Sequence, residues 1–290
     1  MGDTISLAKA GLTAALGSAS VAHTDISGST LDVTMSNGNT LSLQLQSGVD
    51  YSGKCFTVST LPNGDVGLMF SDAAPNMKTG VAGSGYGNPY IDSLVWGWGA
   101  WNTSAPITYW FGEPADTADA IATHGATSAL NAKTVVHQWK PTAEAAVQKA
   151  FAEFAAVSGL TFQAAVSAAA ANIVVWAMPR IEENSHILGE SEIPAERPDG
   201  HIWTFFNDGA ASFGNLQVGG DGLDTIVHEL GHALGLAHPH DGGSEPDATL
   251  FPGVVNGSTG DNGQNQSVYT VMSYNPGWNG APSTLSYGGQ

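Results

Sequence analysis

The segment from residue 228 to residue 238, which reads His-Glu-Leu-Gly-His-Ala-Leu-Gly-Leu-Ala-His, constrains the fold of this chain more than any other stretch. His228 and His232 are four residues apart, so on a helix their side chains share one face and reach a common point. On a continuing helix, His238 would lie about 9 Å further along the axis. Gly235 accepts the left-handed conformation that ends helices, so we predict that the helix stops there and the chain returns His238 to the other two histidines.

The chemistry of these side chains predicts a metal site. Three neutral imidazoles with a fourth position left open form the ligand set of a catalytic zinc ion, whereas structural zinc sites are closed by four protein ligands. Glu229 follows the first histidine and is angled away from the metal, where a carboxylate acts on a water molecule instead of coordinating. The alternative, a helix with solvated histidines, needs five fixed positions to coincide by chance, with a probability on the order of 10⁻⁵. The sequence therefore predicts zinc at His228, His232 and His238.

The histidine motif and two other segments together resemble a known protein family. The segment resembles the metzincin metallopeptidases, and Pro239 after the third histidine is typical of their serralysin branch. Residues 267–274, Ser-Val-Tyr-Thr-Val-Met-Ser-Tyr, are similar to the Met-turn of that branch. The resemblance implies that Met272 forms an apolar floor under the zinc site and that Tyr274 is an additional zinc ligand with a catalytic role. It begins at Asn88, where the chain is similar to the start of serralysin catalytic domains.

This resemblance implies a secreted zinc-dependent endopeptidase that acts on protein or peptide substrates. Glu229 would act as general base on a zinc-bound water, and Tyr274 would hydrogen-bond the developing oxyanion. The resemblance also places the substrate antiparallel along an edge strand, which we expect at about His186 to Ile193. Two alternatives stay open: a latent or inactive zinc-binding module, and a protein whose N-terminal β region mediates surface or matrix interaction.

The chain divides into a β-rich N-terminal region at residues 1–75, which we interpret as a pro-domain that inhibits the enzyme, a linker at 76–87, and a catalytic domain at 88–290. In the first region, apolar residues alternate with polar ones on both sides of Asn37-Gly38, which predicts a hairpin. A second hairpin is predicted around the turn at residues 62–65.

For the catalytic domain we predict an α+β fold of metzincin type, with a twisted mixed sheet, long helices, the zinc helix and the Met-turn. Residues 142–159 are expected to be helical, with Val147, Phe151, Phe154 and Ala155 on the apolar face. The zinc helix should begin at about Gly222. The expected strands are short apolar runs at residues 107–111, 160–166, 172–178, 186–193 and 201–206.

Residues 219–226 fit one copy of the calcium-binding nonapeptide of β-roll repeats, which bind calcium between stacked copies. A single copy instead predicts that Asp221 caps the zinc helix and that Asp224 lies in its first turn, where carboxylates suit the helix dipole. The resemblance implies structural Ca²⁺ mainly in C-terminal repeats. Only 16 residues follow Tyr274, so we expect the catalytic domain to be truncated at its C-terminal end.

Cys55 is the single cysteine, so no intramolecular disulfide can form. A thiolate is a good zinc ligand, and a cysteine ahead of a metallopeptidase domain can hold the enzyme latent. Strand alternation places Cys55 with Thr57 on the more polar face, which favours accessibility. The surrounding Gly-Lys-Cys-Phe-Thr does not match the cysteine-switch motif of related matrixins, however, and a lone cysteine is more often a small buried residue, so we prefer a structural role for Cys55. His240 is expected to have a surface or supporting role, and the histidines without ligand spacing are interpreted as structural or solvated: His23, His124, His137, His186 and His201.

The charge of the chain excludes several classes of partner. Lys and Arg total 8 against 26 Asp and Glu, a formal charge of −18. Nucleic acids and anionic membranes both require basic patches, which this chain cannot supply. Its longest apolar run is too short to span a bilayer, so membrane insertion is not expected. We expect a monomer.

Overall fold

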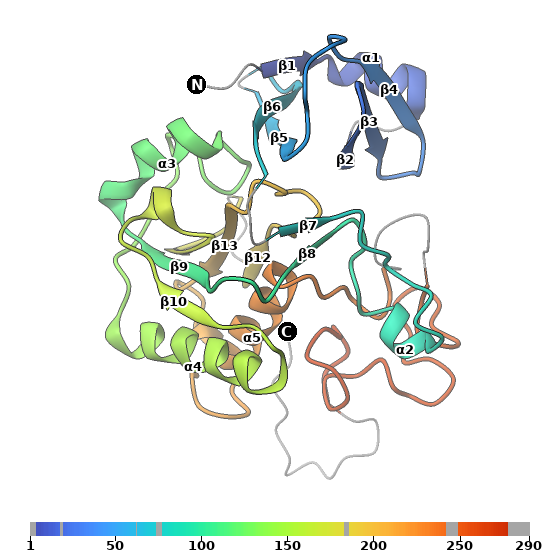
Figure 1. The fold of residues 1–290 in the computed structure, drawn as a ribbon. Helices are drawn as coiled ribbons and strands as arrows, with labels where there is room; N and C mark the ends of the chain where they lie inside the picture. The colour runs from blue at the N-terminus through green and yellow to red at the C-terminus, as the bar shows by residue number, and fades with distance from the viewer. Residues whose placement is uncertain are drawn as a thin grey trace.

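The computed structural model describes residues 4–17, 20–61, 63–73, 77–182, 186–241 and 249–277. A five-stranded sheet forms the centre of the part that the sequence predicts to be catalytic, in the order β10-β9-β11-β13-β12 (Figure 1). Four strands are parallel, and the edge strand β12 is antiparallel to β13. The mixed sheet and its helices confirm the predicted α+β fold. The strands are β9 (Ile107–Gly112), β10 (Phe162–Ala164), β11 (Ile173–Met178), β12 (Gly189–Ser191) and β13 (Ile202–Asn207).

All five predicted strands are present, but the two outer ones are shorter than expected. β10 and β12 span only three residues each, because each pairs with the sheet along one side and the chain soon turns away. The inner strands β11 and β13 are buried along their whole length. Such uniformly apolar strands are expected where both faces of a sheet are covered.

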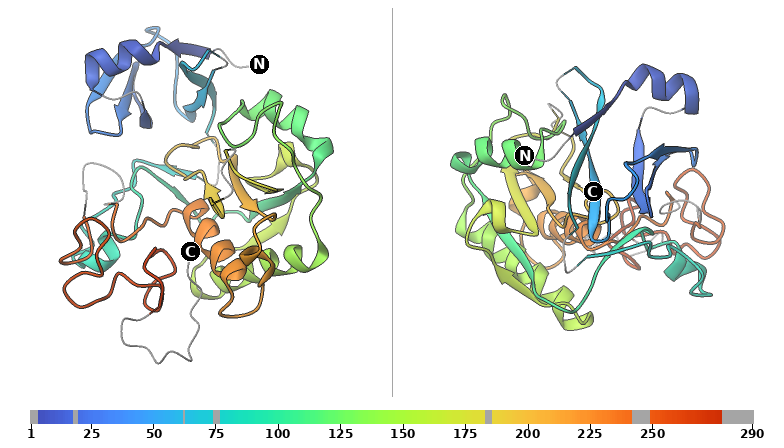
Figure 2. Two further views of the ribbon diagram at one scale, coloured as in Figure 1. Left: turned by 180° about the vertical axis from the view of Figure 1, so that it is seen from behind. Right: turned by 45° about the horizontal axis from the view of Figure 1, so that its top comes forward.

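Two helices cover one face of the sheet and one helix covers the other (Figures 1 and 2). α4 (Pro141–Val157) and α5 (Asp221–Ala233) share an apolar core with the sheet on the first face. α3 (Thr117–His124) packs on the second face, around Trp176 and Trp203. The predicted zinc helix is α5, so the site belongs to the first face. Short 3-10 turns lie at Pro114–Asp116, Ala168–Ala170 and Ser212–Gly214.

The predicted helix at residues 142–159 is α4, and Pro141 occupies its first turn, where its fixed φ suits a helix start. The buried face of α4 contains more small residues than the sequence predicted. Three of them are alanines, which let the helix approach the sheet closely. Phe154 and Ala155, predicted on this face, are only partly buried. The buried residues of α4 are Ala143, Ala146, Val147, Ala150 and Phe151.

The N-terminal region contains two three-stranded antiparallel sheets around a common apolar core, ordered β2-β3-β4 and β1-β6-β5. Both predicted hairpins are confirmed, as β3 with β4 and as β5 with β6. The elements before Ser27 were not predicted, because α1 buries only Leu12 and gives little apolar periodicity. The elements are β1 (Thr4–Leu7), α1 (Lys9–Leu16), β2 (Val21–Ser27), β3 (Thr30–Met35), β4 (Thr40–Gln44), β5 (Lys54–Thr60) and β6 (Val66–Asp72).

The stretch predicted as a linker joins the catalytic part through a short sheet. In it, β7 (Met77–Thr79) pairs antiparallel with β8 (Gly99–Trp101). The helical turn α2 (Pro89–Asp92) follows, and the side chain of Asn88 accepts a hydrogen bond from the Tyr90 backbone N–H at its start. No helix among the described residues has both the length and the apolar character needed to cross a bilayer.

The N-terminal region contacts the catalytic part on the side of α3 (Figure 1). The His23 ring of β2 stacks on Trp98, with ring centroids 4.0 Å apart. Met69 and Ser71 of β6 line a cavity of about 310 Å³, to which Trp203 of β13 also contributes. Through β6 the region therefore lies against the face of the sheet opposite α5, while the His23 contact is close to the end of α5, where Gly235 O accepts a hydrogen bond from the Trp96 backbone N–H.

Two valines of α4 test how this helix packs on the central sheet. Val147 is fully buried, whereas Val157 on the same helix is 86% exposed. Val147→Ala removes two buried carbon atoms and leaves a cavity, so we expect it to lower the free energy of unfolding by about 2–3 kcal/mol. Val157→Ala is the matched control and should change it by less than about 0.5 kcal/mol. Chemical denaturation measures both, and equal effects would contradict the assigned orientation of α4.

Candidate metal centre and catalytic site

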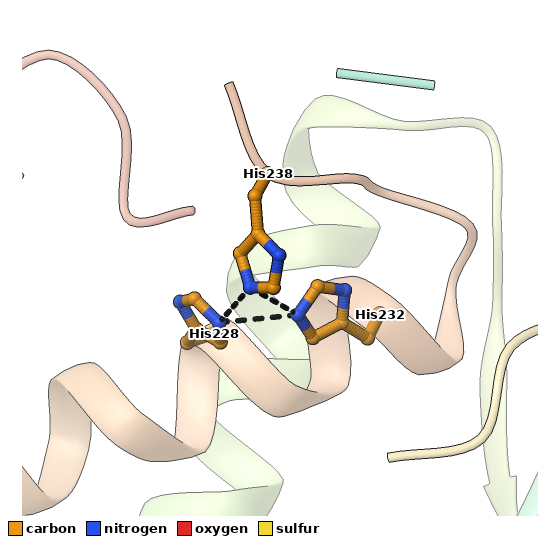
Figure 3. Close-up of side chains that lie close together, drawn as sticks. All are labelled: His228, His232 and His238. Carbon is orange, nitrogen blue, oxygen red and sulfur yellow. Dashed lines mark hydrogen bonds between the residues drawn. The ribbon is translucent and has the colours of Figure 1, made fainter. Parts of the chain in front are cut away.

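The end of α5 has the geometry that the sequence predicted. Gly235 has φ of 100°, and its backbone N–H donates to His232 O at 2.9 Å. The next N–H, of Leu236, donates to Gly231 O at 2.8 Å. These two bonds form a Schellman motif, which satisfies carbonyl groups left open at the end of a helix. The chain then turns back and carries His238 over the helix (Figure 3).

Three histidine side chains meet at one point above α5 (Figure 3). The Nε2 atoms of His228 and His238 are 3.1 Å apart, and those of His232 and His238 are 2.9 Å apart. The third edge, between His228 and His232, is 3.1 Å. Around a tetrahedral zinc ion, ligand nitrogens are separated by about 3.3 Å. The triangle therefore has nearly the size that a zinc ion requires.

The opposite ring nitrogens show why this cluster fits a cation. His228 Nδ1 donates to Val271 O at 2.7 Å, and His232 Nδ1 donates to Leu236 O at 2.8 Å. His238 Nδ1 contacts Asp241 Oδ2 at 2.5 Å. A neutral imidazole carries a hydrogen on only one of its two ring nitrogens. When that nitrogen is Nδ1 in all three rings, the three Nε2 atoms keep their lone pairs, and these face one another. Repulsion among these lone pairs is relieved by a positive ion in their midst, so the donor set fits a metal.

Burial keeps two of these rings in the form that binds metal. It lowers the pKa of His228 to about 4 and the pKa of His232 to about 3, with a further lowering from His238. Both rings are therefore neutral at neutral pH and need not lose a proton before coordination. Asp241, which the sequence analysis did not identify, orients the third ring, as carboxylates commonly do for metal-binding histidines. The only sequence signal for it is its position three residues after His238.

Glu229 lies at the base of the cluster and is only 6% exposed. Burial raises the pKa of its carboxyl group to about 8, and the charge of Glu190 acts in the same direction. Gly189 of the edge strand β12 makes room for it, since a Cβ at that position would come within 2.3 Å of Glu229 Cγ. The side chain is thus held between α5 and the edge strand.

An open cavity of about 310 Å³ adjoins Glu229 and the edge strand. His186, which the sequence analysis treated as structural or solvated, lies in its wall, although nothing in its sequence spacing indicated this. The cavity connects a buried carboxylate with a strand whose outer edge pairs with no other strand of the described residues. Its lining residues are His186, Ile187, Leu188, Gly189, Thr225, Glu229 and Tyr274.

Met272 lies directly under the metal helix and is 1% exposed. A Cβ at Gly231 would approach Met272 Sδ to 2.8 Å, so the glycine permits this close contact. Side-chain hydrogen bonds hold the turn in place: Ser273 Oγ donates to Asn265 Oδ1 at 2.7 Å, and Asn265 is fully buried. The expected apolar floor is therefore present.

Tyr274 projects from this turn toward the histidines and is half exposed. Its ring stacks on His228 with centroids 5.6 Å apart and is tilted against His238 at 4.5 Å. Burial raises the pKa of its phenol to about 12, helped by Glu229 and Asp241, so the hydroxyl keeps its proton. His240 stacks on His238, which agrees with the supporting role predicted for it.

Cys55 is 5% exposed, which confirms the interpretation of this cysteine as a buried structural residue. Only the accessibility indicated by strand alternation is wrong, because the face of β5 that carries Cys55 and Thr57 is also covered. The Cys55 thiol lies 3.3 Å from Ser71 Oγ, burial raises its pKa to about 11, and it is absent from the metal-ligating group found among the described residues. Asp221 does not cap α5. The N-cap is Gly220, and Asp221 and Asp224 both lie in the first turn.

Comparison with known proteins identifies the domain. Residues 126–256 match the matrixin family of peptidases (Peptidase_M10), and this span includes α5 and all three histidines. This match supports a metzincin-type metallopeptidase catalytic domain in the chain. It is also 36% identical over 75 residues to a serralysin of Photorhabdus luminescens. That alignment covers 25% of this chain and 15% of the serralysin, so it spans a small part of the relative's length.

Asp241 provides a test of the metal centre. Asp241→Ala removes the acceptor for His238 Nδ1, so we expect zinc affinity to fall about 10- to 100-fold. Asp241→Asn keeps an acceptor oxygen without the charge, so its zinc affinity should fall less than that of Asp241→Ala. Zinc affinity is measured by competition with a chromophoric chelator, and Asp119→Ala, at an exposed position on α3, serves as control. Unchanged affinity in Asp241→Ala would show that this carboxylate does not support the ligand.

Proposed function

We propose that this protein is a secreted zinc-dependent endopeptidase of serralysin type that hydrolyses peptide bonds in proteins. The observation that carries the proposal is the meeting of three Nε2 lone pairs beside a buried carboxylate and an open cavity. The matrixin match supports the peptidase class, and the partial similarity to a serralysin supports the branch.

His228, His232 and His238 would hold the zinc ion, with Tyr274 as an additional ligand. Bound zinc supplies a Lewis acid that activates water and polarises a carbonyl group. Glu229 must be ionised to accept a proton, and a cation held by the neighbouring histidines lowers its raised pKa toward that state. Its carboxylate then takes the proton of the attacking water and returns it to the leaving amine.

Two further groups position the substrate and stabilise the reaction. The Tyr274 hydroxyl, which keeps its proton, would donate a hydrogen bond to the oxyanion that develops on the peptide carbonyl. The edge strand β12 borders Glu229, and no strand among the described residues pairs with its outer side, so a peptide would bind along it by backbone pairing. This strand lies within the stretch that the sequence predicted for that role.

Several finer points belong to the same proposal. Secretion and a structural role for calcium rest on the resemblance to serralysins, and we expect a monomer. We assign residues 1–75 to a β-rich N-terminal region and residues 88–290 to the catalytic domain, joined by residues 76–87.

Replacing Glu229 tests the peptidase proposal. Glu229→Ala removes the general base but no zinc-binding nitrogen, so we expect the rate of cleavage of an unfolded protein to fall at least about 10²- to 10⁴-fold. Zinc content, measured by atomic spectroscopy, should stay near that of the wild type. Equal inactivity of both proteins at full zinc occupancy would overturn the proposal and favour an inactive zinc-binding module.

Inhibition by residues 1–75 is a separate proposal. Met69 and Ser71 of this region lie on the face opposite α5, so direct blocking of the cavity beside Glu229 would require this part of the region to move. If residues 1–75 inhibit the enzyme, removing them raises the turnover of the catalytic domain. Measurement of kcat per zinc-loaded molecule checks this, and a change of less than about twofold would contradict an inhibitory pro-domain.

A further inference from the structure

The free edge of β12 can be assigned residue by residue. Leu188 O accepts a hydrogen bond from the Asn207 backbone N–H, and the Glu192 N–H donates to Trp203 O. Backbone groups of successive residues alternate between the two edges of a strand. Gly189 and Ser191 therefore direct their N–H and C=O groups away from β13, toward an edge that no other described strand occupies.

This pattern fixes where a substrate side chain lies. A peptide that adds antiparallel to this edge pairs with the backbone of Gly189 and Ser191. The substrate residue opposite Glu190 then occupies a position without direct hydrogen bonds, where facing Cα atoms are only about 4.5 Å apart and side chains are close. Such directly opposite side chains interact most strongly across a sheet.

Side chains alternate between the two faces of a strand, so the substrate residue opposite Glu190 lies on the face of β12 away from the cavity beside Glu229. Gly189 faces α5, because a Cβ there would touch Glu229. Glu190, the next residue, points to the other face of the strand. The substrate side chain opposite Glu190 therefore meets the Glu190 carboxylate, while its neighbour in the peptide faces α5.

The Glu190 carboxylate is partly buried and has acidic neighbours. Burial raises its pKa to about 7, and the charges of Glu182 and Glu192 act in the same direction. It makes no ion pair with a Lys or Arg among the described residues. A half-buried carboxylate in such surroundings is stabilised by a cation brought close to it.

The composition of the chain agrees with a cationic substrate. Its formal charge of −18 attracts positively charged peptides over a distance and favours their encounter with the cleft. With only 8 Lys and Arg in 290 residues, the protein also offers few such sites to another copy of itself. A preference for cationic side chains would thus limit self-cleavage.

We propose that Glu190 is a specificity-determining residue that selects a Lys or Arg side chain at the substrate position opposite it on the edge strand. This inference rests on the proposed peptidase function and names the substrate class of that site. Glu190 forms an ion pair with the substrate cation across the strand, close to the bond that is cut.

A positional scan tests the inference with the zinc-loaded full chain. Lys is placed in turn at each position flanking the cut of a neutral peptide. Norleucine at the same position, which has the same four side-chain carbons without the ammonium group, is the uncharged control. We expect one position at which kcat/KM is about tenfold higher for Lys than for norleucine. In Glu190→Gln this ratio should fall to within about twofold of unity, whereas Glu153→Gln, an exposed residue of α4, should leave it unchanged.

The outcomes separate this inference from the function on which it rests. Cleavage without a Lys preference, or a preference that Glu190→Gln retains, would overturn the role of Glu190 and leave the peptidase proposal standing. No cleavage of any peptide by the zinc-loaded protein would overturn both. If Glu190→Gln does not fold, the wild-type ratio is measured against salt concentration. An electrostatic preference must weaken as salt rises, and a constant ratio would contradict it.

Discussion

Three imidazole lone pairs that meet within 3.1 Å are the constraint around which this structure is arranged. Two of the three rings come from successive turns of one helix, so α5 must be regular through His232. The third comes from beyond the helix, so α5 must end within one turn after it. Each ring is then fixed from behind by an acceptor, and these acceptors come from the Met-turn, the helix end and Asp241.

The central sheet gives this cluster its second wall. Its strands β11 and β13 are buried on both faces and form a rigid support for α5. The antiparallel strand β12 extends the sheet until Gly189 touches Glu229. A buried carboxylate, a cluster of three histidines and a strand edge left unpaired by the described residues thereby come together, although they arise from segments far apart in the sequence.

The parts that could be predicted from the sequence are those set by local geometry. The spacing of His228 and His232, the glycine that ends the helix and the apolar period of α4 all follow from helix parameters. The roles of Gly189, Gly231 and Asp241 could not be predicted, because each depends on which distant side chain approaches it. The burial of the face that carries Cys55 could not be predicted for the same reason: strand alternation assigns a face to a residue, but not what covers that face.

Gly235, which ends α5 ahead of His238, has a backbone conformation that depends on the chirality of the residue placed there. A Cβ built at this position meets nothing closer than 3.8 Å, so a larger residue would not be excluded by lack of room. The obstacle is the φ of 100°, which L-amino acids rarely adopt and which is the mirror image of a dihedral they favour. A D-alanine introduced here by chemical synthesis would suit the turn better than L-alanine. The turn at position 235 therefore restricts the chirality of its residue more strictly than the size of that residue.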